Sequence, residues 1–361
     1  MRIAIDARAA AEVPAGRGRY VRELLAALAR DQRDEEYVLL ARQRWEHAGL
    51  DGRFRWHLRD LPDPLWALWA AGAARGADGL LATNSYLMCV APPASVATVY
   101  DLVAFDRELG APRTSVAERA TLPIAVRRAS ALACISRATR DALVERFPSA
   151  ADRAHVVTLG VEPRFFADAA AAEQTGARLG LDRPYVLMIG TLEPRKNIVR
   201  AVQAFAGLPA ALQDHYQLVL AGPRGWGTGE IDAALAEHLA LVRVLGHVAE
   251  DDLPGLYAGA ELFLYPSLGE GFGLPVLEAM AAGTAVVTSG ISSLPEVGGE
   301  AARYADPRNV EAIRAAVAEL LGDQELRATL GDLGRQRARG FGWERTARET
   351  LALLPALSAR A

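Results

Sequence analysis

Short apolar runs alternate with segments of helical spacing along most of the chain. Such runs are typical of strands that are buried on both faces, because parallel sheets carry helices on either side. The pattern therefore predicts an α/β fold built on parallel sheets. In the first half the runs lie at residues 3–6, 37–40, 79–82, 95–100 and 131–135, and a second series begins at Tyr185, Gln217, Val242, Leu262 and Ala285.

The two series of strands predict two domains. A chain of 361 residues is too long for one typical hydrophobic core and suits two cores of ordinary size. We expect an N-terminal domain at 1–163 and a C-terminal domain at 164–342. The segment 343–361 contains an amphipathic helix and is expected to cross back onto the first domain. Because open sheets bind ligands at the carboxyl ends of their strands, we expect a binding cleft between the domains.

The composition is typical of a soluble globular protein. Hydrophobic residues make up 51% of the chain and charged residues 23%, and the net charge of -4 gives no reason to expect nucleic acid as a partner. The chain opens on a strand at Met1–Asp6 without the apolar core of a signal peptide, and no stretch approaches a membrane span. We therefore expect a cytoplasmic protein. Cys89 and Cys134 lie in apolar surroundings and are expected to be buried free thiols.

Lys196 is the only lysine among 40 lysine and arginine residues, which suggests a need for an ammonium group at this position. It follows Arg195, between the predicted strand Tyr185–Ile189 and a predicted helix at Ile198–Phe205, with Asn197 expected to cap that helix. Free backbone N–H groups and the helix dipole make such a position an anion site, and two cations beside it favour a diphosphate. The alternative is a lysine on a solvated turn.

Two glutamates flank a glycine-rich turn in the second domain. Glu270 lies between the first two of the glycines at positions 269, 271 and 273, which open access to the backbone, and Glu278 follows on a helix that Pro275 begins and Gly283 ends. Carboxylates accept hydrogen bonds from paired hydroxyls, which sugars and riboses present. The alternative is that Glu278 compensates the helix dipole and that Glu270 is solvated.

Two weaker signals accompany these motifs. Gly16 and Gly18 follow the first strand and precede a predicted helix at Val21–Arg30, so their backbone N–H groups could approach an anion. His247 and Val248 end a strand in the second domain and could flank a nucleotide base. Either pattern alone is equally typical of an ordinary turn.

Together these motifs resemble the retaining glycosyltransferases of family 4, also called glycosyl transferase group 1, and the resemblance runs over nearly the whole chain. It implies the GT-B architecture, which is two facing Rossmann-like domains with a cleft between them. It also implies a nucleotide-sugar donor held mainly by the second domain and a glycan or lipid-linked acceptor held mainly by the first. The segments that carry it are Gly16–Tyr20, Thr98–Leu102, Ser136 with Arg140, Leu159–Val161, Gly190–Asn197, Pro266–Leu268, Gly269–Glu278, Thr288–Ser289 and Ser292–Glu296.

The resemblance also implies roles for individual residues. Arg195 and Lys196 hold the diphosphate and, with Glu270, form the catalytic set, while Glu278 takes the ribose hydroxyls and Gly16 supports the distal phosphate. Glu270 holds the donor sugar together with the backbone of Gly271, Phe272, Gly273 and Leu274. Val248 and Asp101 complete the expected donor site.

One position departs from the family. Tyr100 stands where a histidine commonly precedes the aspartate, so a phenol replaces a group that titrates near neutral pH. Tyr100 can still form a hydrogen bond with a hydroxyl.

The expected chemistry needs neither a metal ion nor a cofactor. Breaking a sugar–diphosphate bond builds negative charge on the leaving group, which the two cations stabilise. No Asp-x-Asp pair of the kind that holds a divalent ion on a diphosphate is present in the sequence. We expect retention of the anomeric configuration and rank GDP-mannose first as donor, because the contexts of Glu270 and of Ser292–Glu296 look most like those of mannosyltransferases.

Several alternatives stay open. A UDP-hexose could be the donor, and a GT-B epimerase or a pyridoxal-phosphate phosphorylase with Lys196 as Schiff-base partner would use the same architecture. A catalytically silent subunit that binds nucleotide-sugars is the alternative from another class. The basic stretch between residues 113 and 140 leaves peripheral contact with a membrane surface open.

Overall fold

The chain forms two compact units, the first made of Met1–Gly160 with Gly342–Ala361 and the second of Val161–Phe341. The structure, a computed structural model, describes residues 1–13, 16–31, 34–47, 49–85, 87–90, 94–106, 108–109 and 112–354. The last seven residues of the predicted segment 343–361 lie outside the described residues, as does the side chain of Cys89.

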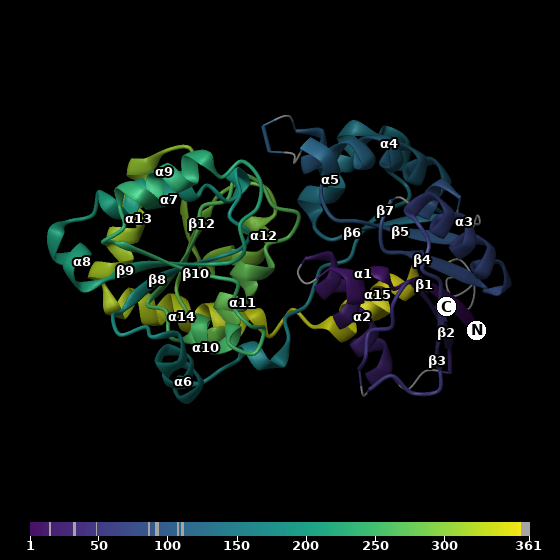
Figure 1. The fold of residues 1–361 in the computed structure, drawn as a ribbon, viewed down its shortest axis with the longest axis horizontal. Coiled ribbons are helices and arrows are strands. Elements are labelled where there is room, and N and C mark those ends of the chain that lie inside the picture. Colours follow the sequence, from purple (N-terminus) through teal and green to yellow (C-terminus); the bar gives the residue numbers. More distant parts are fainter. Residues whose placement is uncertain are drawn as a thin grey trace. The chain divides into compact units, whose positions relative to one another are not determined.

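The first unit is a seven-stranded parallel sheet in the order β3-β2-β1-β4-β5-β6-β7. Helices α1, α2 and α15 lie on one face and α3, α4 and α5 on the other (Figure 1). The strands are β1 Arg2–Asp6, β2 Glu36–Ala41, β3 Phe54–Leu58, β4 Gly79–Ala82, β5 Ser95–Val99, β6 Ala131–Cys134 and β7 Ala154–Val156. The helices are α1 Arg8–Glu12, α2 Arg17–Arg30, α3 Asp63–Ala73, α4 Pro112–Arg128, α5 Arg137–Arg146 and α15 Trp343–Ala352.

The second unit is a six-stranded parallel sheet in the order β10-β9-β8-β11-β12-β13. Helices α7, α9 and α13 cover one face and α10, α11 and α14 the other (Figure 1). The strands are β8 Tyr185–Ile189, β9 Gln217–Ala221, β10 Val242–Gly246, β11 Leu262–Tyr265, β12 Val286–Ser289 and β13 Arg303–Ala305. The helices are α6 Ala169–Leu179, α7 Ile198–Ala206, α8 Ala210–His215, α9 Gly229–Glu237, α10 Leu253–Ala258, α11 Leu274–Ala282, α12 Leu294–Gly298, α13 Val310–Gly322 and α14 Gln324–Ala338.

Within the described residues, seven short 3-10 helices connect these elements. The one that matters for the site is η6, Pro194–Lys196, between β8 and α7. The others are η1 Ala74–Gly76, η2 Leu87–Cys89, η3 Val103–Phe105, η4 Pro148–Ala150, η5 Pro163–Phe165 and η7 Gly299–Ala301.

The predicted α/β class with parallel sheets is confirmed, and the strand at Tyr185–Ile189 has the predicted bounds. The pattern did not predict β3, β7 and β13, which are all edge strands. An edge strand has one neighbour and keeps part of its surface in water, so it needs no continuous apolar run. The burial along β3 and β13 is accordingly mixed.

Helix α15 belongs to the first unit and packs on α2. Its first residue, Trp343, is buried, and its ring centroid lies 6.2 Å from that of Tyr20. A Cβ on Gly160 would lie only 2.3 Å from the backbone nitrogen of Trp343, so this contact requires glycine.

One expectation for the first unit is wrong. Helix α2 begins at Arg17 rather than Val21, so Gly18 lies in the first turn of the helix and not in a loop before it. A Cβ on Gly18 would lie 1.6 Å from the carbonyl oxygen of Val13, which shows that the glycine allows close packing of α1 and α2. None of the helices in the described part of the chain is both long enough and apolar enough to span a membrane.

Candidate functional site

The candidate site lies at the carboxyl ends of β8 and β11, which are neighbours in the second sheet. After β8 the chain turns at Gly190, whose φ of 145° is unfavourable for other residues, and reaches η6. A Cβ on Gly190 would lie 3.3 Å from Cε of Lys196. The turn therefore brings the aliphatic part of the lysine against the backbone and fixes its direction.

Asn197 holds η6 against the loop that follows β11. It is the N-cap residue of α7, as predicted, but its backbone is left-handed with φ 60° and its side chain makes no capping hydrogen bond. Instead the buried amide Nδ2 donates to the carbonyl oxygens of Pro266 at 2.9 Å and Pro307 at 2.6 Å. A left-handed residue followed by a helix directs the side chain away from the first turn, where it can join two other segments.

A charged cluster, defined here as Glu193, Arg195, Lys196 and Glu270, forms the centre of the site. Nη1 of Arg195 lies 2.7 Å from Oε2 of Glu270, and Nζ of Lys196 lies 2.7 Å from Oε1 of Glu270. Arg195 also pairs with Glu193 at 2.8 Å and donates to the carbonyl oxygen of Gly269 at 2.8 Å. The structure thus brings the three predicted catalytic residues into direct contact.

Two neutral side chains complete the environment of Glu270. Oη of Tyr265 donates to Oε1 of Glu270 at 2.9 Å, and Oγ of Ser267 donates to the same oxygen at 2.6 Å. Nζ of Lys196 in turn donates to Oη of Tyr265 at 2.5 Å. The sequence motifs did not indicate Tyr265, and they included Ser267 in Pro266–Leu268 without giving it a role. The position of both residues at the carboxyl end of a central strand, just before Glu270, was the signal that could have indicated their role.

The charges in the cluster shift one another's pKa. Burial tends to raise the pKa of Glu270, but the charges of Arg195 and Lys196 and the hydrogen bonds to them outweigh it and lower this pKa to about 2. Burial lowers the pKa of Lys196 more than Glu270 raises it. Burial also opposes the charge of Arg195, yet its acidic neighbours keep the pKa of that guanidinium raised. The site therefore presents an ionised carboxylate over the whole neutral range.

The glycine-rich turn is held by two serines that follow β12. The backbone N–H of Glu270 donates to Oγ of Ser292 at 3.0 Å, and Oγ of Ser293 donates to the carbonyls of Glu270 at 3.0 Å and Phe272 at 2.8 Å. Gly273 has φ 112°, and a Cβ there would lie 2.8 Å from Cδ2 of Leu294. The turn therefore has one backbone conformation before α11 begins.

The remaining predicted residues of the second unit lie in this turn, in α11 and in the loop after β10. Gly271 and Phe272 are buried, and the Phe272 ring packs edge-on against Phe341 at 6.1 Å. Leu274 is the first residue of α11, which Gly283 ends in a left-handed conformation as predicted. Val248 is buried in the loop after β10.

Glu278 lies inside α11 and is buried, with only 2% of its surface exposed. Its Oε2 accepts a hydrogen bond from Oη of Tyr257 at 2.8 Å. Glu278 therefore has a neutral phenol as partner where Glu270 has two cations.

The predicted residues of the first unit lie at the carboxyl edge of its own sheet. Gly16 has φ 55° and precedes α2, and Oδ1 of Asp101 accepts from the backbone N–H of Val103 at 2.9 Å. Oη of Tyr100 donates to the carbonyl oxygen of Thr83 at 2.9 Å. Burial, only partly opposed by the charge of Arg17, raises the pKa of the Tyr100 phenol well above its usual range, so the group stays protonated at neutral pH.

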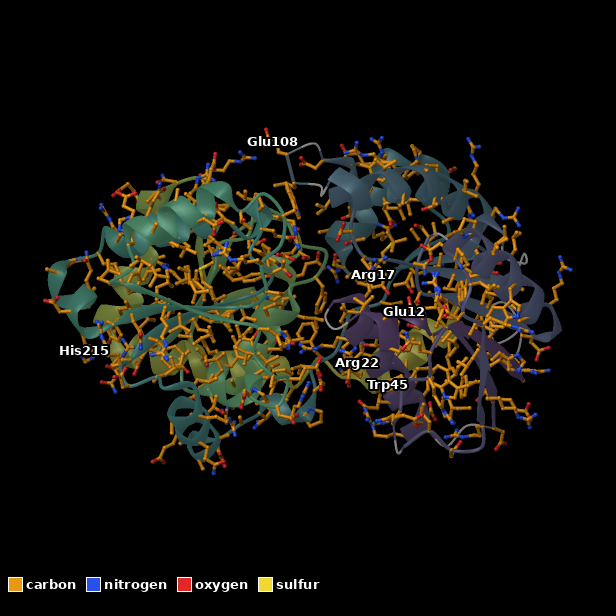
Figure 2. The ribbon with its side chains drawn as sticks, viewed as in Figure 1. Glu12, Arg17, Arg22, Trp45, Glu108 and His215 are labelled. Atoms are coloured by element: carbon orange, nitrogen blue, oxygen red, sulfur yellow. The ribbon has the colours of Figure 1, made fainter. Side chains whose placement is uncertain are left out.

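An open hollow of about 680 Å³ lies on the first unit beyond β2 and β3. Arg42 crosses it and pairs with Glu12, which Figure 2 labels, and with Asp63. The charged side chains that line the hollow thus largely form ion pairs with one another. Within the described residues, no group of three or more histidine, cysteine, aspartate or glutamate side chains is arranged to hold a metal ion.

Comparison with known proteins places these features in context. Residues 173–337 match the family model described as Glycosyl transferases group 1. The O-antigen chain mannosyltransferase B of Escherichia coli is 45% identical over 170 residues, which cover 46% of this chain and 44% of that protein. The MMP alpha-(1->4)-mannosyltransferase of Mycolicibacterium hassiacum is 32% identical over 234 residues, which cover 63% of this chain and 54% of that protein. The match spans about half the length of these two relatives.

Solved structures resemble the fold over the full chain. Sucrose-phosphate synthase from Thermosynechococcus elongatus has a TM-score of 0.80 at 23% identity and covers 100% of both chains. HepE from Anabaena, in complex with UDP and glucose, has a TM-score of 0.78 at 19% identity and covers 99% of this chain and 100% of that one. At such identities the likeness shows the fold alone. It confirms the GT-B class that the motifs predicted.

Proposed function

We propose that this protein transfers a hexose from a nucleotide-sugar to a hydroxyl of a glycan or lipid-linked acceptor, because residues 173–337 match the model of the glycosyl transferases group 1. Mannose is the first candidate for the sugar, and the new linkage keeps the α configuration of the donor. The proposal rests on one observation above all, the contact of Arg195 and Lys196 with Glu270 at the carboxyl ends of adjacent strands.

The charged cluster fits the chemistry of this transfer. Cleavage of the sugar–diphosphate bond places negative charge on the leaving phosphate, and Arg195 and Lys196 lie close together where they can turn from Glu270 to stabilise it. Both cations lie just before α7, whose free N–H groups add to the positive potential. The leaving phosphate itself accepts the proton of the acceptor hydroxyl, so no separate base is required.

The remaining contacts of the donor follow from the same assignment. Glu270 and the backbone of Gly271 to Leu274 hold the sugar, Glu278 takes the ribose hydroxyls and Val248 flanks the base. Gly16 and Asp101 of the first unit contribute the distal phosphate and sugar contacts, and Tyr100, whose hydroxyl donates to the Thr83 carbonyl, contacts the sugar without donating to it. Relatives named mannosyltransferases support mannose, and GDP-mannose is therefore our first donor, with UDP-hexoses second.

A thermal-shift panel of GDP, UDP, ADP and TDP sugars tests donor binding, because a ligand that binds only the folded protein raises its apparent stability. The donor that binds is then used for transfer, and the anomeric configuration of the product is determined by NMR. We expect an α product from an α donor and activity that survives EDTA. A β product, or activity that EDTA abolishes and Mg²⁺ or Mn²⁺ restores, would contradict the assignment.

A silent subunit that binds nucleotide-sugars is the second candidate, and one observation favours it. Tyr100 replaces the family's usual histidine, and its phenol donates to the Thr83 carbonyl. Slow hydrolysis of the bound donor without acceptor would indicate a catalytic site, whereas tight binding with neither hydrolysis nor transfer would favour the silent subunit. Peripheral contact with a membrane surface is part of the proposal only for lipid-linked acceptors.

A further inference from the structure

The phenol oxygen of Tyr265 contacts both a cation and a carboxylate of the charged cluster. It ends β11 and is buried, with 2% of its surface exposed. Its Oη accepts a hydrogen bond from Nζ of Lys196 at 2.5 Å and donates one to Oε1 of Glu270 at 2.9 Å. The ammonium nitrogen also lies 4.9 Å from the centroid of the phenol ring. One side chain thus fixes the distance between a cation and a carboxylate.

The charges of the cluster make the hydrogen bond from Tyr265 to Glu270 important when a diphosphate binds. Arg195 and Lys196 carry two positive charges, and Glu193 and Glu270 carry two negative charges, so the cluster is neutral overall. A diphosphate that takes both cations must draw them from Glu270. A buried carboxylate that loses its cations is strongly destabilised unless other donors remain. The donors that remain are the hydroxyls of Tyr265 and Ser267.

We propose that Tyr265 is a positioning residue that keeps the Glu270 carboxylate in place when Lys196 turns to the diphosphate of the donor. The role deepens the proposed function and rests on it. Burial, and then the charge of Glu270, raise the pKa of the Tyr265 phenol well above its usual range, so the hydroxyl keeps the proton that it donates. Tyr265 acts through Glu270 and does not itself react.

The single lysine of the chain allows a direct test without any substrate. Protein labelled with ¹³C-lysine gives one Cε signal, from Lys196. Tyr265→Phe should displace this signal and move its titration to lower pH, because the ammonium loses an acceptor. Tyr185→Phe is the matched control. Tyr185 lies on β8 of the same sheet, and its buried phenol donates to the carbonyl oxygen of Leu256 in α10, so the change removes one phenol hydrogen bond away from the cluster. It should leave the Lys196 signal and its titration unchanged.

A superimposable Lys196 signal in folded Tyr265→Phe would overturn the proposal. Kinetics supply the second measurement. We expect Tyr265→Phe to lower kcat for transfer about tenfold, as expected for one hydrogen bond to a charged group, with the Kd of the donor changed by less than about threefold. Equal loss in kcat and Kd, or a loss that Tyr185→Phe reproduces, would reduce Tyr265 to a structural residue. Wild-type protein that neither binds nor transfers from any nucleotide-sugar would instead overturn the proposed function, while the NMR signal still reports the contact.

Discussion

At the carboxyl edge of the first sheet, most polar side chains hold the backbone and neighbouring side chains, and the ion pair of Arg8 with Asp6 is long, at 3.4 Å. Asp6 is fully buried and accepts a hydrogen bond from Asn84 at 2.6 Å. Asp101 accepts from a backbone N–H, and Tyr100 donates to the backbone carbonyl of Thr83. Each of these contacts fixes a loop next to a strand.

At the carboxyl edge of the second sheet the strongest contacts join charged side chains. Glu270 takes two cations at 2.7 Å, and the serines that hold its loop bind the backbone only. A cation that is paired with a glutamate can exchange this partner for the phosphate of a ligand and stay paired. A side chain that leaves the backbone for a ligand gives up a contact that holds its loop. This difference supports our proposal that the second edge provides the main contacts for the anionic donor, while most contacts at the first edge hold its loops.

Replacing Glu270 should give the largest effect, because it removes the group around which the second edge is organised. We expect Glu270→Gln to lower the rate of transfer roughly 10²–10³-fold, the loss typical of one preorganised group at a reacting centre. The affinity for the nucleoside diphosphate should stay the same or rise, because the diphosphate no longer competes with a carboxylate for Arg195 and Lys196. Transfer assays and calorimetric titration measure the two quantities.

Glu278→Ala is the companion variant and should weaken nucleoside-diphosphate binding as well as transfer, through the ribose. Glu237→Gln, a change of an exposed glutamate in the same unit, should alter neither. Equal loss of nucleoside-diphosphate affinity in Glu270→Gln and Glu278→Ala would contradict the separate roles.

The stability of the second unit should depend on the ionisation of Glu270 in acid. The pKa of Glu270 is lowered from 4.5 to about 2, so its stabilising contribution is complete above pH 4.5 and is lost as the pH falls through 2. The shift corresponds to about 3 kcal/mol at most. Urea unfolding should therefore show wild type more stable than Glu270→Gln at pH 7, with the difference shrinking between pH 4.5 and 2. A constant difference would mean that the ion pairs add no net stability.

The central strands could be predicted because they follow a local rule, whereas the anion site at Arg195 and Lys196 stays a prediction. Buried parallel strands need continuous apolar runs, and such a run predicted the correct bounds of β8. The single lysine of the chain, beside an arginine, suggested that an ammonium group is needed at this position. The edge strands β3, β7 and β13 were missed because partial exposure relaxes the pattern.

The partners of Glu270 could not be predicted in the same way. Tyr265 and Ser267 contact the carboxylate only because β11 ends beside β8 and the chain then folds back. Gly18 illustrates the same point. It must lack a side chain because the carbonyl oxygen of Val13, on another segment, would lie 1.6 Å from its Cβ. Contacts set by tertiary packing leave no spacing rule in the sequence.

Removing one cation should have an intermediate effect on the second edge. We expect Lys196→Ala and Arg195→Ala each to weaken nucleotide-sugar binding by about 1.5–3 kcal/mol, because each loses a charge-assisted contact with phosphate. Calorimetric titration measures this loss. Arg224→Ala, at an arginine of the same unit that is 63% exposed and pairs with Asp232, is the control and should bind normally. Wild-type affinity in Lys196→Ala would exclude the diphosphate role.

The smallest effect should come from the first edge, where Tyr100→Phe removes one hydrogen bond to the backbone. The phenol proton is already donated to the Thr83 carbonyl, so it is not available to a donor sugar. We expect the unfolding free energy to fall by about 1 kcal/mol and kcat/KM for transfer to change by less than about threefold. Urea unfolding and initial rates measure the two. A loss of tenfold or more in kcat/KM with unchanged stability would show that the hydroxyl serves the substrate, and the contrast between the two edges would then fail at the position where this chain departs from the family that it resembles.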